Sequence, residues 1–204
     1  MQSDAILSAD RLREQIPSYL TGPQQQALVA ALGKLPDHKD YFLNNTRFSN
    51  VLLQGDCWGN CAIFNYSTGD KKSVKCLILS NSCDVSDENK RDTVPRVVVA
   101  PVIALEKLNS LLRKNNVSED RIDEINRAVR NQALTSIFYL PDAVGGLGKE
   151  YITFLDDLHS IPLDAFLISC SGHKRFSLNY VGFYLLIFKI SLHFCRLKEG
   201  VDRS

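Results

Sequence analysis

Several classes of protein are excluded by what this sequence lacks. Glycine and proline are ordinary in number, 11 and 7 among 204 residues, and no repeat or low-complexity segment is visible, so a fibrous or disordered chain is not expected. Basic and acidic residues nearly balance, 24 against 23, for a formal net charge of +1. Such a chain has no overall field that attracts nucleic acid or membranes, so either partner would need a local patch of charge.

A long uninterrupted hydrophobic run is also missing. The most apolar segment, residues 176–197, contains Asn179, Lys189, His193 and Arg196. It therefore falls short of the roughly 20 apolar residues that a bilayer-spanning helix needs. The sequence starts with no basic segment followed by an apolar run, so we expect a cytoplasmic protein without a secretion signal or membrane contact.

The six cysteines are scattered, which does not suggest a disulfide framework, and we expect reduced, mostly buried thiols. Cys57 and Cys61 lie four residues apart on a predicted strand, where simple alternation would put them on one face as half of a zinc site. No second Cys or His pair has ligand spacing. The sequence therefore predicts no metal and no other cofactor.

The order of predicted elements indicates one α+β domain over residues 1–204. Hydrophobic residues make up 45% of the chain, enough for a core. We expect a helical extension at 1–50, an antiparallel β-barrel at 51–170 with a helical insert at 104–133, and a C-terminal helix at 171–204. Strands are predicted at 57–66, 75–80, 96–102, 137–140 and 151–155. In the insert, helices are predicted at 104–114 and 119–133, the second with Ser118 as its N-cap.

The N-terminal extension contains two predicted helices. The first carries an apolar stripe within residues 6–16, and the second begins with Pro23 in its first turn and ends at Gly33.

The last predicted helix is apolar on most of its circumference. A narrow stripe at helical spacing carries Asn179, Gly182, Leu186, Lys189, His193 and Arg196. One flank of this stripe consists of Phe183, Ile187, Ile190 and Phe194. Two alternatives account for such a helix: it is buried in the core, or this flank is an interface with a second copy, as a homodimer, or with another protein.

Three stretches resemble the MazF/PemK-like toxins. They are Gly-Asp-Cys-Trp at 55–58, the run 76–80 followed by Val-Val-Val-Ala-Pro-Val at 97–102, and the segment 140–161 with Leu-Pro, a glycine-rich loop and a strand. The resemblance covers residues 52–103 and 137–170. It implies an SH3-like β-barrel with a C-terminal helix, metal-independent cleavage of single-stranded RNA, a role in toxin–antitoxin or anti-phage defence, and an antitoxin protein as partner.

The sequence departs from that family where its chemistry lies. The family's Arg-Pro pair aligns with Val74 and Lys75, and its Thr or Ser aligns with Ile103. Valine and isoleucine can neither transfer a proton nor stabilise a phosphorane, and Lys75 supplies only a point charge. Two functions therefore stay open: an RNA-directed endoribonuclease, or a module that has lost the chemistry and serves protein–protein interaction.

Other residues could supply chemistry in place of the family's. Cys83 and Asp84 follow the second predicted strand, where a thiol beside a carboxylate could act as a nucleophile with His173 or His159 as base. The candidate catalytic residues are Lys75, Asp84 and His173. The alternative is a turn capped by its own side chains.

Basic residues also gather in the predicted loops. Lys71 and Lys72 lie in the first hairpin, Lys90, Arg91 and Arg96 lie in or after the second loop, and His173, Lys174 and Arg175 precede the last helix. Trp58, Phe64 and Tyr66 would share a strand face if the strand alternated regularly. Cations beside aromatic surfaces hold unpaired nucleic acid. The candidate contacts with single-stranded RNA are therefore the five basic residues of the two loops: Lys71, Lys72, Lys90, Arg91 and Arg96.

Overall fold

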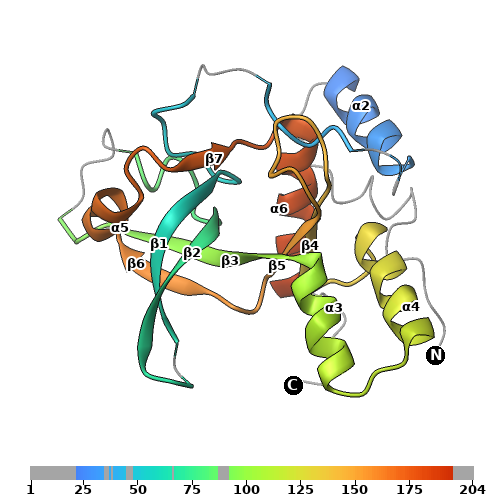
Figure 1. Ribbon diagram of the computed structural model, residues 1–204. Coiled ribbons are helices and arrows are strands. Elements are labelled where there is room, and N and C mark those ends of the chain that lie inside the picture. Colours follow the sequence, from blue (N-terminus) through green and yellow to red (C-terminus); the bar gives the residue numbers. More distant parts are fainter. Residues whose placement is uncertain are drawn as a thin grey trace, which may run out of the picture.

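The structure is a computed structural model that describes residues 22–34, 37, 39–44, 48–65, 67–86 and 92–194. Helix α2 (Gly22–Leu32) is the first element of this part (Figure 1). It begins beside Pro23 and ends before Gly33, whose N–H donates to the Val29 carbonyl at 3.0 Å, as predicted. The stripe predicted within residues 6–16 lies outside the described residues.

Seven strands of the described residues form one antiparallel sheet. They are β1 (Cys57–Asn65), β2 (Asp70–Ile78), β3 (Arg96–Ala104), β4 (Ile137–Leu140), β5 (Tyr151–Phe154), β6 (His159–Pro162) and β7 (Lys174–Phe176). Their order is β4-β5-β3-β2-β1-β7, with β6 paired to β3. Val102 of β3 pairs with Thr153 and Val99 pairs with His159, so β5 and β6 follow one another along the same side of β3.

The prediction of a closed barrel was wrong, although that of an antiparallel α+β protein is confirmed. The outer strands of the path, β4 and β7, pair only with β5 and β1 within the described residues. Within the described residues, no backbone hydrogen bonds join β4 to β7, and side chains fill the space between these two strands. Phe42 bridges to Leu178, and both residues join Phe138 of β4 in one apolar cluster.

Three apolar clusters each hold a different helix layer on the sheet. The helical insert is confirmed: α3 (Leu105–Lys114) and α4 (Glu119–Arg130) pack through Leu105 and Val129 on the outer side of β4 and β5. The predicted N-cap is present, since the Arg121 N–H donates to Ser118 Oγ at 3.4 Å. A short helix that the sequence did not predict, α5 (Leu163–Cys170), covers part of β1 through Phe166. The third layer is α6 (Tyr180–Phe194), which packs on the remaining cluster.

The C-terminal helix is shorter than predicted, because 171–179 forms a turn, strand β7 and a bridge before α6 begins. Three members of its polar stripe, Gly182, Leu186 and Lys189, are buried, whereas Arg196 lies outside the described residues. Gly182 lies so close to Tyr41 that an added Cβ would be 2.6 Å from the Tyr41 carbonyl oxygen. Lys189 is fully buried, and its Nζ donates to the carbonyls of Gln132, at 2.8 Å, and Leu134.

The apolar flank predicted as an interface is partly covered within the chain, since Phe183 and Ile190 pack against the core cluster, and α2 runs beside α6 (Figure 1). Phe183, Ile187 and Ile190 are half-buried, and Phe194 is 53% exposed. Among the helices of the described residues, none has the length and apolar character needed to cross a membrane.

Candidate nucleic-acid interface

A one-residue bulge in β1 decides which side chains share a face. Trp58 pairs with Cys76 of β2, and Cys61 pairs with Val74, so β1 has one residue more than β2 between these pairs. The extra residue is accommodated at Gly59 and Asn60, and Asn60 has a φ of 57°. Side chains of a strand alternate, and an inserted residue reverses that alternation from there on.

The bulge corrects two predictions made from regular alternation. Cys57 belongs to the cluster under α6, whereas Cys61 belongs to the cluster under α5, so the two thiols lie on opposite faces. Trp58 and Cys61 share the α5 side, and Phe64, three residues after Cys61, lies on the other side. Trp58 is only 6% exposed and offers no stacking surface, and Tyr66 lies outside the described residues.

Beyond the bulge, β1 and β2 continue as a two-stranded ribbon, residues 61–65 and 70–74, which leaves the sheet (Figure 1). Lys75, through Val102, is the last residue of β2 paired with β3, since the last two residues of β3 pair with β5 alone. From there outward β2 has only β1 as a neighbour. An isolated two-stranded ribbon is at best marginally stable in water, so it needs packing on at least one face.

One face of the ribbon receives that packing. Ile63 and Val74 pack against the cluster that includes Leu163 and Phe166 of α5. Lys72 pairs with Ile63 and therefore lies on this same face, at its outer end.

The other face, here called the open face, consists of Ala62, Phe64, Lys71 and Ser73. All four side chains are exposed, and Phe64, which pairs directly with Lys71, is 43% exposed. The open face thus combines a cation with a large aromatic ring on a pleated surface, which are the features that contact the phosphates and bases of an unpaired strand.

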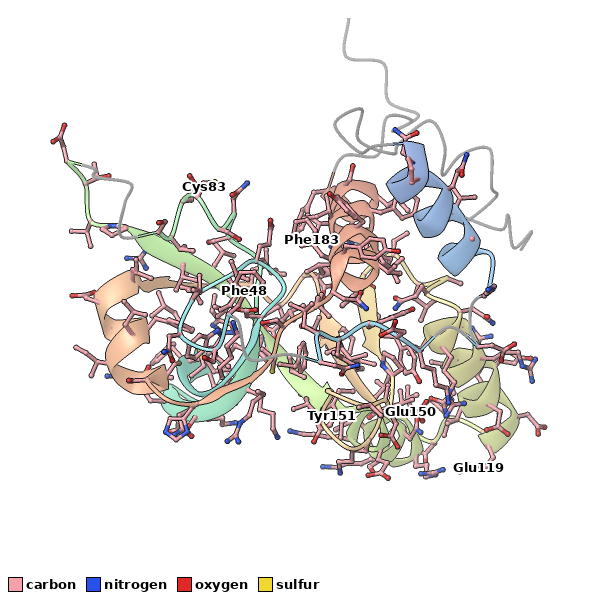
Figure 2. All side chains as sticks on the ribbon, turned by 90° about the horizontal axis from the view of Figure 1, so that it is seen from above. Phe48, Cys83, Glu119, Glu150, Tyr151 and Phe183 are labelled. Atoms are coloured by element: carbon pink, nitrogen blue, oxygen red, sulfur yellow. The ribbon has the colours of Figure 1, made fainter. Side chains whose placement is uncertain are left out.

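The open face continues onto the sheet through Lys75 and Arg175. Lys75 lies four residues after Lys71 in β2, so the two side chains are on the same face of the strand. The Nζ of Lys75 lies 5.3 Å from the centroid of the Tyr151 ring on β5, across β3. The Nζ of Lys149 lies 5.9 Å from the same ring centroid. Figure 2 shows Tyr151 next to Glu150 in sequence and in space, and the Tyr151 ring belongs to the apolar cluster under α6.

Arg175 of β7 lies over the bulge. A Cβ added to Gly59 would be 3.0 Å from Arg175 Nε, so the glycine leaves the space that the guanidinium occupies. Burial raises the pKa of the Cys57 thiol to about 12, and the nearby charges of Lys75 and Arg175 oppose that shift. Both cations therefore act on the same short segment of β1, at the point where the ribbon joins the sheet.

A buried ion pair stabilises the other side of this junction. Asp56 is fully buried, and its Oδ2 lies 2.7 Å from Lys174 Nζ, whose side chain is 11% exposed. The same Nζ donates to the carbonyls of Phe48 and Val51, at 2.7 and 2.8 Å. Burial raises the pKa of Asp56, while the bonds from Lys174 and from the Leu53 N–H oppose the increase. Lys174 therefore ties residues 48–53 to β7 and is engaged in structure.

The predicted catalytic residues lie on three separate elements. Lys75 is on β2 and faces Tyr151, as described. Asp84 is in the turn after β2, where the N–H groups of Cys83 and Asp84 donate to Asn81 Oδ1 and to the Asn81 carbonyl, at 2.9 and 3.0 Å. His173 is half-buried in the turn before β7, and its carbonyl accepts from the Gly59 N–H at 2.8 Å. Their catalytic role stays a prediction.

Side chains of the turn at 80–84 bond amides both within the turn, at Asn81, and in neighbouring segments, while a capping role of Asp84 stays a prediction. Ser82 Oγ accepts the Gln54 N–H at 2.9 Å, and Ser80 Oγ accepts the Val98 N–H at 2.7 Å. Within the described residues, no cluster of His, Cys, Asp and Glu is arranged to hold a metal ion.

The predicted RNA-contacting cations do not form one group. Lys71 is on the open face and Lys72 on the face covered by α5. Arg96, at the start of β3, donates from Nε to Ser160 Oγ at 2.8 Å and from Nη2 to the Ser160 carbonyl at 2.6 Å. Lys90 and Arg91 lie outside the described residues. Lys149, Tyr151 and Gly59 were not predicted, although a glycine inside a strand pattern is a known signal for a bulge.

The two positions that align with the toxin family's chemistry lie in apolar clusters. Val74 packs under α5, and Ile103 packs under the helical insert. Neither side chain is on the open face, and both are half-buried against these clusters.

Comparison with known proteins adds no assignment, since no family model and no curated protein matches this chain.

Proposed function

We propose that this chain binds single-stranded RNA along the open face of the β1–β2 ribbon, as a diverged MazF/PemK-like module that holds RNA without cutting it. The observation that carries the proposal is the asymmetry of the ribbon. One face packs on α5, while the other displays Phe64 and Lys71 and leads to Lys75 and Arg175.

Single-stranded RNA suits this surface better than duplex RNA. The exposed Phe64 ring can stack only on a base that is not already paired and stacked, and the lysines and arginine beside it match the phosphates of an extended strand. The net charge of +1 leaves no general attraction for nucleic acid, so binding depends on this local group.

The positions of Val74 and Ile103 support binding without cleavage. A proton-transferring side chain must reach the RNA, and these two side chains are apolar and half-buried. In a cytoplasmic toxin–antitoxin or anti-phage system, the module would then bind RNA and not degrade it.

The test is to measure the affinity for a mixed-sequence single strand and for a duplex of equal length over a range of salt concentrations. Three phosphate contacts, from Lys71, Lys75 and Arg175, should give a slope of log affinity against log salt of about −2, at about 0.7 per contact. The single strand should bind more tightly, and should stay intact in the presence of EDTA. No binding at low salt contradicts the proposal, and cleavage in EDTA would favour the endoribonuclease.

A protein-interaction module is the second candidate. Ile168 on α5 is 83% exposed and its neighbour Leu167 is 40% exposed, and Phe194 is exposed at the end of α6. These apolar side chains could contact an antitoxin-like protein or a second copy of the chain.

A further inference from the structure

A pocket of about 400 Å³ lies beside β7, and it shares Arg175 with the group of cations described above. Its lining includes Asn44, Phe48, Ser49, Gly145, Arg175 and Ser177. These residues come from the segments 43–44 and 48–49, from the loop between β4 and β5, and from β7 and the residue after it. The volume lies within the usual range for pockets that hold small molecules or single groups of a larger ligand.

The walls of the pocket are held in place before any ligand binds. Lys174 fixes the Phe48 carbonyl, and the Leu43 N–H donates to the Ser177 carbonyl at 2.9 Å. The loop between β4 and β5 forms a third wall, and it passes close to Asn44 at Gly145. This glycine has a φ of 82°, and a Cβ added to it would be 2.7 Å from Asn44 Oδ1. The first two contacts are made by backbone and by the buried lysine, so the backbone at Leu43 and Phe48 needs little ordering when a ligand binds.

Arg175 connects the pocket to the ribbon. It lines the pocket, and its guanidinium lies over Gly59 in the bulge, where β1 passes Lys75. A strand whose phosphates follow Lys71 and Lys75 therefore reaches the mouth of the pocket at Arg175.

The lining has the chemistry of a site for a nucleobase. Phe48 supplies an aromatic ring, Ser49 a hydroxyl, and the exposed Asn44 an amide that both donates and accepts hydrogen bonds. Among the described residues that line it, none has an acidic side chain. Unpaired bases are recognised in proteins by stacking on aromatic rings and by hydrogen bonds to their polar edges.

We infer that this pocket receives one unpaired base of the RNA strand that the open face holds, and that Asn44 selects which base it is. The inference rests on the proposed function, and it adds a sequence preference to a surface that otherwise recognises only charge and stacking.

The experiment compares four RNA oligomers of equal length, each a uridine tract with A, C, G or U at one central position, at a fixed salt concentration. Wild type should prefer one or two of the four by about tenfold. Asn44→Ala should remove that preference and leave the salt slope unchanged. Asn50→Ala is the matched control, because Asn50 is an exposed asparagine of the same segment that lines a different pocket, and it should keep the preference.

The outcomes separate this inference from the function on which it rests. Binding of all four oligomers with equal affinity overturns the base pocket and leaves RNA binding by the ribbon in place. A preference that survives Asn44→Ala overturns the role of Asn44 in this pocket. Absence of binding to every oligomer at low salt overturns the proposed function, and the pocket with it.

Discussion

Lys71 and Lys72 are consecutive residues whose side chains lie on opposite faces of the same ribbon. Lys71 pairs with the exposed Phe64, and Lys72 pairs with Ile63, which packs toward α5. The two lysines carry the same charge and are both exposed. They therefore form a matched pair that separates the effect of the open face from the effect of charge in general.

We predict that Lys71→Gln weakens binding of single-stranded RNA several-fold at about 0.1 M salt. It should reduce the slope of log affinity against log salt by about 0.7, the value for one phosphate contact. Lys72→Gln should leave both quantities close to wild type. Fluorescence anisotropy with a labelled oligomer measures both. Equal losses for the two variants would mean that the ribbon acts only through its total charge.

The bulge provides a second prediction. Gly59→Ala introduces a Cβ where the Arg175 guanidinium lies, and the flexible arginine, not the backbone, should move. RNA affinity should fall by less than in Arg175→Gln, because the guanidinium shifts by only a few tenths of an ångström, and the free energy of unfolding should change by less than about 1 kcal/mol. The double variant should bind no more weakly than Arg175→Gln alone, because both changes act on one contact. Additive losses would show that Gly59 acts independently of Arg175.

The buried ion pair of Asp56 and Lys174 should dominate the stability of the 48–53 segment. Lys174→Met leaves the carboxylate of Asp56 buried without its cation, which typically costs about 3–5 kcal/mol. Adding Asp56→Asn should recover part of that loss. The ring of Trp58, the one tryptophan of the sequence, has its centroid 5.7 Å from Lys174 Nζ, so its fluorescence reports unfolding in denaturant. A loss below about 1 kcal/mol for Lys174→Met would contradict this role.

Lys189 should make stability depend on pH. Burial lowers its pKa from 10.5 to about 7, and a neutral amine still has two N–H groups for the carbonyls of Gln132 and Leu134. Between pH 7 and about 10, the unfolded chain binds a proton that the folded chain does not, so raising the pH through this range stabilises the fold. The slope from this one group is up to about 1.4 kcal/mol per pH unit.

The measurement compares wild type with Lys189→Met at pH 7, 8 and 9. Buried Cys57, Tyr41 and Tyr139 have raised pKa values and oppose the trend at higher pH, but they are present in both proteins and cancel in the difference. The stability of wild type relative to Lys189→Met should rise with pH. A difference that is constant from pH 7 to 9 would show that Lys189 keeps its charge in the fold.

The outer flank of α6 gives a prediction about assembly. Phe194 is 53% exposed, so Phe194→Asp should leave the fold intact and convert an oligomer to a monomer in sedimentation experiments. Phe183 is half-buried and packs against the core, so Phe183→Asp should also lower stability or solubility. If wild type sediments as a monomer and Phe194→Asp is an equally folded monomer, this flank is not an interface between copies.

The sequence by itself determined the elements whose signals are local. The helical insert followed from periodic apolar residues and from Ser118 at a helix start, and the end of α2 followed from Gly33, because capping and periodicity act within a few residues. The antiparallel arrangement followed from the order of strands and helices. These features need no knowledge of which distant segments meet.

Only the tertiary structure decided on which face of its strand or helix each side chain lies. One extra residue at Gly59 and Asn60 separates Cys57 from Cys61 and places Phe64 with Lys71, because alternation along a strand reverses at a bulge. Lys189 faces the core because carbonyls at the end of α4 are there to accept its hydrogen bonds, and the periodicity of α6 cannot indicate them. The sheet stays open because α6 and Phe42, distant in sequence, fill the space between its outer strands.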